Sequence, residues 1–375
     1  MFEAKTLVPA DGEMIEDAPL APSMRAPIAD DKAMLKAAAT LTRDLNRPDA
    51  KIFWFDLIAS VLVGYGALIG AMFTAAVAPK AALLAVAILA IYRAGSFIHE
   101  IAHIKKGDLP HFRTAWNLLV GIPLFAPSFM YEGVHNQHHA KTKYGTIDDP
   151  EYLPLASMRP WTLPLFMIYG AFAPVLLLLR FALLAPLSFF SKRLRTLVVE
   201  KYSGLQINPD FRRAWPEGDA ARRFTLQEVG ATLWAWALIG MTATGILPLS
   251  AFLTFMGAAC GMMAMNQLRT LVAHLWENDE RQPMSVTQQY LDSVNVPPPS
   301  TLPALWAPVG LRYHALHHLL PGVPYHNLGK AHRLLSVELE EASSYHKTSA
   351  SGLWPLVANL TRQSFARRSA TPRNG

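Results

Sequence analysis

The chain has 375 residues, enough for one large domain or two ordinary ones. Hydrophobic residues make up 51% and charged residues 17%, which is apolar for a soluble protein of this size. A lone cysteine, Cys260, excludes an intramolecular disulfide and any cluster of thiolate ligands. The formal charge of +6 comes from basic residues beside apolar runs, so we interpret it as a membrane-facing bias and expect no nucleic-acid partner.

The first segment, residues 1–52, carries charge and proline rather than an apolar run. Its opening stretch, "MFEAKTLVPADGEMIEDAPL", has no basic start followed by an apolar core, so we expect no cleavable signal peptide. Lysine and arginine then recur up to Lys51. We interpret residues 1–52 as an N-terminal segment in the cytosol.

Two apolar runs follow, and together they predict a helical hairpin through a membrane. Leu57 to Ala78 is uncharged and long enough to span a hydrocarbon core of ~30 Å at ~1.5 Å per residue. After a short turn at "APK", a second run continues from Ala81 to Ile98 and is interrupted only by Arg93. We expect Arg93 to snorkel to the membrane surface or to face a neighbouring helix.

A second hairpin is predicted over Val229 to Leu268, which is uncharged and too long for one span. Glycine and proline near residues 245–250 permit a tight reversal there. Two weaker apolar segments lie between the hairpins. Residues 115–131 carry prolines and suit a partial insertion or an interfacial helix. Residues 161–190 are cut by Arg180 and are compatible with one span, a shallow hairpin or an interfacial pair.

Basic residues flank the predicted hairpins on the side of the long loops, while the tight reversals are poor in charge. The positive-inside rule therefore places the N-terminus and every large loop in the cytosol. We predict an all-α integral membrane protein with two transmembrane helical hairpins, about four spans, interfacial helices and a cytosolic cap. The membrane domain with its cap covers residues 53–346. Residues 347–375 are expected to form a basic tail, frayed from about Ser349.

Eight of the thirteen histidines fall in three short windows at the predicted cytosolic ends of these segments. The windows are HxxxH with His99 and His103, "HNQHH" with His135, His138 and His139, and "HALHH" with His314, His317 and His318. Positions i, i+3 and i+4 share one face of a helix, so each triple can direct three imidazoles at one point. Buried imidazoles need partners, and a metal supplies one partner for all of them.

The number of these imidazoles predicts two metal ions rather than one. A structural zinc site closes with four protein ligands and a catalytic site uses three. Eight imidazoles are therefore too many for one zinc, and they suit two ions that each keep an open position for a small molecule. Imidazole binds zinc, copper, iron and nickel alike, so the spacing does not select the metal.

The order HxxxH, HxxHH, HxxHH around two hairpins resembles the membrane fatty acid desaturase family, over about Leu57 to Arg333. "TIDDPEYLP" resembles the acidic-proline segment of that family, and "GLRYHALHHLLPGVPYHNLGKAH" is similar to its bacterial members. The resemblance implies two iron ions held almost wholly by histidines, with one further ligand at the position of His274. It also implies a multi-pass protein of the bacterial inner membrane, with its active site on the cytosolic side.

In some family members an asparagine four residues before that further histidine assists the metal through water. Here the position is Thr270, and Asn266 and Asn278 lie two turns before and one turn after His274. The asparagine role therefore stays open in this chain.

The resemblance implies an oxidoreductase that uses O2 to convert a methylene pair of an acyl chain to a double bond. The substrate would be an acyl-lipid, acyl-CoA or acyl-carrier, held in a narrow apolar channel. The sequence shows no haem domain, thiolate set or G-x-G-x-x-G turn, so we expect electrons from a separate ferredoxin- or cytochrome-type donor. A lipid hydroxylase or a carotenoid ketolase or hydroxylase shares the three boxes and is the alternative within the superfamily.

The stretch "HEIAH" also matches the H-E-x-x-H pattern of zinc metalloproteases. That interpretation predicts one zinc and requires neither HxxHH cluster. Glu100 lies about 100° round the helix from His99, from where it could accept a hydrogen bond from a metal-bound imidazole. A metal transporter or sensor would instead predict histidines that line the membrane interior.

The remaining histidines and several tryptophans are expected to have plainer roles. We place His111, His326, His332 and His346 on the cytosolic surface, with His326 or His332 as a candidate support for a ligand. We interpret Trp54, Trp116, Trp161 and Trp234 as interfacial or lipid-facing anchors.

Overall fold

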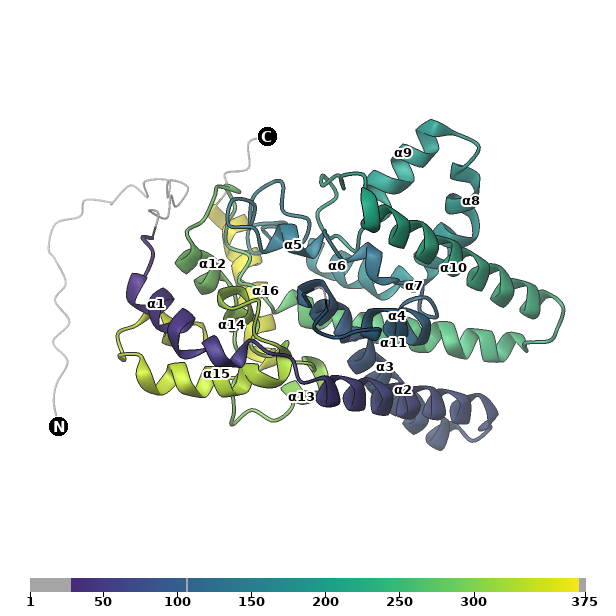
Figure 1. Ribbon diagram of the computed structural model, residues 1–375, viewed down its shortest axis with the longest axis horizontal. Helices are drawn as coiled ribbons and strands as arrows, with labels where there is room; N and C mark the ends of the chain where they lie inside the picture. Colours follow the sequence, from purple (N-terminus) through teal and green to yellow (C-terminus); the bar gives the residue numbers. More distant parts are fainter. Residues whose placement is uncertain (1–27, 106, 371–375) are drawn as a thin grey trace, which may run out of the picture.

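Long helices lie on one side of the molecule and a group of short helices lies on the other (Figure 1). The computed structural model describes residues 28–105 and 107–370, and within these residues the only β pairing is three isolated bridges. The long helices are α2 (Ala50–Phe73), α3 (Val77–His103), α10 (Gly218–Ala243) and α11 (Leu249–Leu271). Helix α2 packs on α3, and α3 packs on α11.

The first predicted hairpin is confirmed by α2 and α3, both of which are long and apolar enough to cross a membrane. The Asp49 side chain caps α2 by accepting a 2.8 Å hydrogen bond from the Lys51 N–H. The break between the helices lies at residues 74–76, slightly before the predicted "APK" turn. The helices approach closely at Gly64, where an added Cβ would lie 2.8 Å from Ile91 Cγ1.

The charge that interrupts the second apolar run faces the neighbouring helix. Arg93 Nε donates a 2.7 Å hydrogen bond to Asp56 Oδ1 on α2, and Asp56 Oδ2 also accepts one from the Tyr325 hydroxyl at 2.9 Å. This is one of the two arrangements expected for Arg93. The ion pair joins α2 to α3 and, through Tyr325, to the cap.

The second predicted hairpin is present as α10 and α11, with its reversal at residues 244–248 as expected. Helix α11 is apolar and long enough to cross a membrane, whereas α10 is not. The first half of α10 carries Asp219, Arg222, Arg223 and Glu228, so only its second half is uninterrupted. Among the described residues three helices therefore qualify as spans, or four if one bent pair is counted.

That bent pair is the segment at residues 161–190. It consists of α6 (Thr162–Ala171), α7 (Ala173–Leu179), a π-helical turn (Arg180–Leu184) and α8 (Ala185–Ser188), with a bend of 53°. Arg180 is buried and pairs with Glu228 at 2.6 Å, which explains how a charge sits within an apolar run. The segment packs on α11.

Residues 115–131 form broken, largely buried helical turns rather than one continuous helix. They include the end of α4 (Phe112–Trp116), a π-helical turn (Asn117–Gly121) and a 3-10 turn (Ser128–Met130). Trp116 is buried and donates its indole N–H to the Ala94 carbonyl at 2.8 Å, so the expectation of a lipid-facing Trp116 was wrong. Trp161 is exposed, and Trp54 and Trp234 are half-buried.

The cap is built from short helices drawn together from the whole chain. They are α1 (Lys32–Leu41), α5 (His135–His138), α12 (Val286–Asp292), α13 (Pro303–Trp306), α14 (His314–Leu319), α15 (Tyr325–Glu338) and α16 (Leu353–Ala370). Helix α9 (Lys192–Lys201) lies apart from them and packs on α8 (Figure 1). Residues 1–27 of the predicted N-terminal segment lie outside the described residues. Helix α1 packs on α15.

The C-terminal residues correct the expectation of a frayed tail. Helix α16 buries Leu360 in one apolar cluster and packs Leu356 and Val357 against another. Gln363 donates a 2.8 Å hydrogen bond to Glu277, three residues beyond His274. Apolar residues at a helical spacing from Leu353 onward carry this signal, and the basic residues nearby obscured it.

Candidate metal centre

The nine histidines singled out in the sequence converge in the structure as two adjacent clusters. The first contains His99, His103, His135, His139 and His317, and the second contains His138, His274, His314 and His318. Within each cluster one nitrogen from every residue lies within 4.8 Å of the others. Segments more than 200 residues apart in the chain therefore meet at one place, as the sequence predicted.

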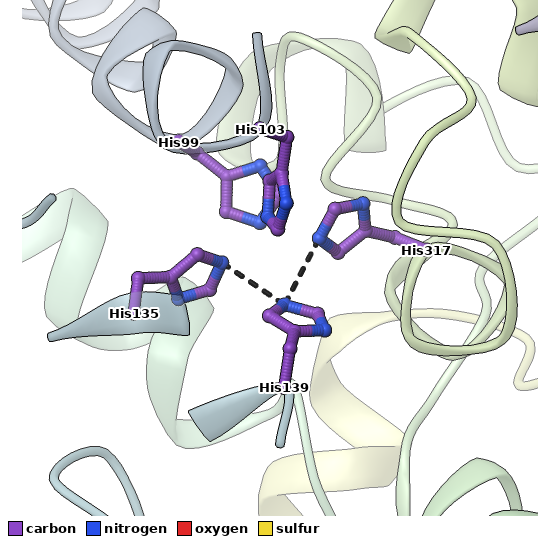
Figure 2. Close-up of side chains that lie close together, drawn as sticks. All are labelled: His99, His103, His135, His139 and His317. Carbon is purple, nitrogen blue, oxygen red and sulfur yellow. Dashed lines mark hydrogen bonds between the residues drawn. The ribbon is translucent and has the colours of Figure 1, made fainter. Parts of the chain in front are cut away.

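The first cluster joins the end of α3 to the two later boxes (Figure 2). His99 and His103 project from the last turns of α3, one helical turn apart. His139 Nε2 lies 3.0 Å from His135 Nε2 and 3.1 Å from His317 Nε2. The imidazoles therefore present their nitrogens to a common centre rather than to solvent.

The second cluster has the same character and includes the expected ninth histidine. His314 Nε2 lies 3.0 Å from His274 Nε2 and 3.2 Å from His318 Nε2. His274 follows the end of α11, where an isolated bridge to Ser293 fixes its backbone. His138 completes the group from the end of α5.

Each HxxHH box is divided between the clusters, which the sequence did not predict. His135 and His139 point into the first cluster and His138 into the second. His314 and His318 point into the second cluster and His317 into the first. Residues i and i+4 therefore stay together, and the intervening histidine is turned to the other centre. The expectation that each triple meets at one point was wrong in this respect.

The donor set fits metal ions. Both ring nitrogens of His99 and Nε2 of His103 are buried without a hydrogen-bond partner among the described residues, a costly state for polar atoms. Two nitrogens bound at about 2.1 Å to one ion and at right angles to each other lie about 3.0 Å apart. The spacings between neighbouring imidazoles are close to this value. Imidazole nitrogens as the whole donor set suit iron, zinc, copper and nickel.

Carboxylates hold two of these imidazoles from behind. His138 Nδ1 lies 2.9 Å from both oxygens of Asp149, which is fully buried. His135 Nδ1 lies 3.0 Å from Glu151 Oε1 and 2.9 Å from the Tyr131 hydroxyl. A carboxylate on Nδ1 fixes the ring orientation and leaves Nε2 free for an ion. The "DDPEY" stretch therefore supplies the supports of the second box.

A third support is a chain of hydrogen bonds from His274 through Tyr144 to Asp292, called the relay below. No local pattern in the sequence predicted it. His274 Nδ1 lies 2.8 Å from the Tyr144 hydroxyl, which donates a 2.9 Å hydrogen bond to Asp292 Oδ2. Since the single hydroxyl proton of Tyr144 goes to Asp292, the His274 Nδ1–H is the donor to Tyr144. The three residues lie on different segments, which is why only the fold reveals the chain of bonds.

Burial keeps most of the cluster neutral. It lowers the pKa of His135, His139, His274, His314, His317 and His318 well below the ordinary value. Burial also disfavours the charged form of His138, but the Asp149 carboxylate outweighs it and raises the pKa of His138. Burial raises the pKa of Glu151 and of Asp292 to about 7. Neutral imidazole is the form that binds a metal.

Glu100 lies beside the first cluster without a hydrogen bond to it. Its Oε1 is 3.7 Å from His99 Nδ1, beyond hydrogen-bond length, and its Oε2 accepts a 2.9 Å hydrogen bond from the Tyr325 N–H. Asn278 donates to the carbonyls of Gly145 and Gln282, and so braces a loop. Neither residue belongs to the two clusters.

A partly open cavity of about 210 Å³ adjoins the first cluster at His99. Its wall includes Tyr131 and Glu151 near the histidines, and Asn266, Arg269 and Thr270 on α11. Apolar side chains also line it, among them Leu124, Ala173, Leu176 and Leu177. The cavity therefore leads from the metal centre to the bent helices α6 and α7.

The four other histidines stay outside the clusters. His111 is exposed, while His326, His332 and His346 are half-buried. His326 Nε2 accepts a 3.0 Å hydrogen bond from the Asp49 N–H, and His332 Nδ1 lies 2.9 Å from the Tyr345 hydroxyl. Both therefore hold cap segments together and contact none of the nine clustered histidines through these bonds.

Comparison with known proteins gives two matches. A family model described as fatty acid desaturase matches residues 73–349, which include all nine clustered histidines. A ceramide hydroxylase of Caulobacter vibrioides (strain NA1000 / CB15N) is 45% identical over 346 residues. This alignment covers 92% of the chain and 98% of the Caulobacter protein.

Proposed function

The chain belongs to the fatty acid desaturase family, and from that premise we propose that it is an O2-dependent lipid hydroxylase acting on a ceramide-type lipid. The observation that carries the proposal is the pair of histidine clusters beside a cavity with an apolar wall. Hydroxylation is preferred to the desaturation expected from the sequence because the Caulobacter relative, matched along nearly its whole length, is a ceramide hydroxylase.

We infer two iron ions, one for each cluster, as the resident metals. Imidazole ligands are compatible with iron, and family membership favours it over zinc, copper and nickel. A zinc protease would need only His99, His103 and one further ligand. That leaves the second cluster and its carboxylate supports without a role.

The reaction balances when R–H, O2, two electrons and two protons give R–OH and water. Bound iron would supply the activation of O2 and the oxidising power for C–H cleavage. The nine imidazoles would hold the metals, and Asp149 and Glu151 would keep the Nδ1 protons of their histidines in place. The cavity wall at His99 would exclude bulk water and hold the reacting carbon near the centre.

The two electrons would come from a separate protein of ferredoxin or cytochrome type. The single cysteine cannot build an iron–sulfur cluster. We further propose that the cap, and with it the metal centre, lies on the cytosolic side of a bacterial inner membrane. The basic residues around the predicted hairpins support this orientation.

Lipid analysis in a host that makes ceramide but lacks this activity tests the proposal. Wild type should yield ceramide with one added oxygen, and His138→Ala, at equal protein level, should yield none. Ceramide or acyl lipid that has lost two hydrogens would establish desaturation instead. Oxidised carotenoids would instead support a carotenoid ketolase or hydroxylase. Unchanged lipids in cells with iron-loaded wild type would contradict the proposal.

A further inference from the structure

One polar atom in the cavity wall lacks a partner although its side chain is held firmly. Gln206 Nε2 donates hydrogen bonds to the Phe211 carbonyl at 3.1 Å and the Asn208 carbonyl at 3.4 Å. These two acceptors fix which end of the amide is nitrogen. Gln206 Oε1 is buried and has no hydrogen-bond partner among the described residues. It is an acceptor that needs a donor.

The absence of a side chain at residue 204 makes room for this oxygen in the cavity wall. Gly204 lines the same cavity, and a Cβ added there would lie 2.8 Å from Gln206 Oε1. The position of the loop is fixed nearby, because the Leu205 N–H donates to the Met130 carbonyl at 2.8 Å. The Gln206 carbonyl oxygen is therefore a preformed feature of the cavity wall.

A second unpartnered atom in the cavity wall is a donor. Arg269 on α11 lines the cavity, and its buried Nε has no hydrogen-bond partner among the described residues. Leaving a buried charged donor unpaired costs more than about 1–3 kcal/mol. One cavity thus offers one acceptor and one donor that the protein itself does not satisfy.

The apolar wall of the cavity reaches the outer surface of the molecule. Tyr169 and Leu176 line the cavity, yet they are 65% and 44% exposed. They belong to α6 and α7, whose outer faces also expose Ile168, Phe172 and Leu179. Since these helices form the bent candidate span, a lipid can reach the cavity sideways from the bilayer.

We propose that this cavity recognises a lipid head that carries both a hydrogen-bond donor and an acceptor, as an N-acylated amino alcohol does. Gln206 Oε1 accepts from an amide N–H or a hydroxyl of the lipid, and Arg269 Nε donates to its carbonyl. Acyl esters and thioesters offer a carbonyl but no adjacent N–H, so they leave Gln206 unsatisfied. This inference rests on the proposed function and names the chemistry that selects its substrate.

Equilibrium binding to the purified metal-loaded protein in detergent tests the inference without an electron donor. The probes are a short-chain ceramide, its ester analogue with oxygen in place of N–H, and an analogue without the head hydroxyls. Wild type should bind at least one analogue about ten- to a hundredfold more weakly than ceramide. In Gln206→Met that ratio should fall to about one. The analogue that Gln206→Met no longer distinguishes from ceramide identifies which lipid group, the amide N–H or a hydroxyl, donates to Gln206.

Two further variants separate recognition from structure. Gln282→Met, the same change at an exposed glutamine, should keep the wild-type ratios. Arg269→Met should weaken ceramide and the ester analogue equally, because both retain the carbonyl. Metal content and thermal unfolding of each variant confirm that the fold persists.

The inference is overturned if wild type and Gln206→Met discriminate the three lipids equally, even when all affinities fall, because a purely structural role gives that result. It is also overturned if wild type does not discriminate at all. Failure of the proposed function is a separate result, since it is read from the lipid products of intact cells rather than from binding ratios.

Discussion

Asp149 holds His138 through both of its carboxylate oxygens, each 2.9 Å from Nδ1, and is itself fully buried. The same carboxylate accepts backbone N–H bonds from Gly145 and Glu151 at 2.8 Å. One side chain therefore shapes the loop after the second box and orients a ligand of the second cluster. This dual role makes Asp149 the most informative of the supporting residues.

Asp149→Asn should weaken metal binding at the second cluster about 10- to 100-fold at neutral pH. It should also change the pH dependence. In wild type the pKa of His138 is raised, so protonation of this imidazole begins to weaken metal binding as pH falls below that pKa. Without the carboxylate, burial lowers the pKa of His138, so proton competition moves to lower pH. Metal content after dialysis across a pH series measures both effects, and identical release curves would contradict the assignment.

Tyr144→Phe should cost metal affinity or activity by about 10- to 100-fold, because it breaks the link from His274 to Asp292. Ring packing against Tyr152 is retained, so thermal stability should change little. Tyr290→Phe is the control, since the hydroxyl of this equally buried tyrosine donates to the Tyr345 carbonyl rather than to the relay. Equal losses in both variants would argue against the relay.

His274→Ala should remove the metal of the second cluster and leave that of the first. His274 is one of four candidate ligands there, whereas none of the five candidate ligands of the first cluster changes. The metal content measured by elemental analysis should therefore fall from two ions per chain to about one. His332→Ala, which alters a half-buried histidine of the cap, should keep both ions. A full complement in His274→Ala would remove this residue from the ligand set.

Asp56→Ala should destabilise the hairpin of α2 and α3 by about 1–3 kcal/mol, because Arg93 and Tyr325 lose the charged acceptor that they share. Replacing Arg93 as well, in Asp56→Ala/Arg93→Met, should recover part of the loss. The free energies of unfolding in detergent of wild type, both single variants and the double variant complete this double-mutant cycle. Strict additivity of the two single substitutions would show that the pair is not coupled.

Gly64→Val should destabilise the same hairpin by about 1–3 kcal/mol through overpacking. The nearest atoms to an added Cβ are Ile91 Cγ1 at 2.8 Å and the Ile91 backbone nitrogen at 3.1 Å, and the latter cannot rotate away. Gly66→Val is the control on the same helix, since nothing lies within 4 Å of its Cβ position. The difference in unfolding temperature between the two variants isolates the close contact.

Sequence patterns with a short period predicted much of the structure. Apolar runs with at most one charge located α2, α3 and α11, and histidine spacing located eight cluster residues. His274 was placed by the family resemblance rather than by spacing. The extent of α10 was misjudged, because buried Glu228 pairs with Arg180 and Arg195.

Contacts between distant segments could not be read in this way. The Tyr144 and Asp292 supports lie 130 and 18 positions from His274, and no local pattern connects them. The division of each HxxHH box depends on how α5 and α14 are rotated against α3, which only packing decides. The C-terminal helix was missed because basic residues obscured its apolar spacing and because its apolar partners include loops far away in the chain, near residues 272–311.

In each of the neighbouring pairs His138–His139 and His317–His318, one ring points into the first cluster and the other into the second. In each pair one peptide bond joins a candidate ligand of the first ion to a candidate ligand of the second. The distance between the two ion positions is therefore fixed at two places, and neither position can shift alone. Occupation of one should therefore pre-order the other, so that in wild type the second ion binds more tightly than the first and reconstitution curves are cooperative.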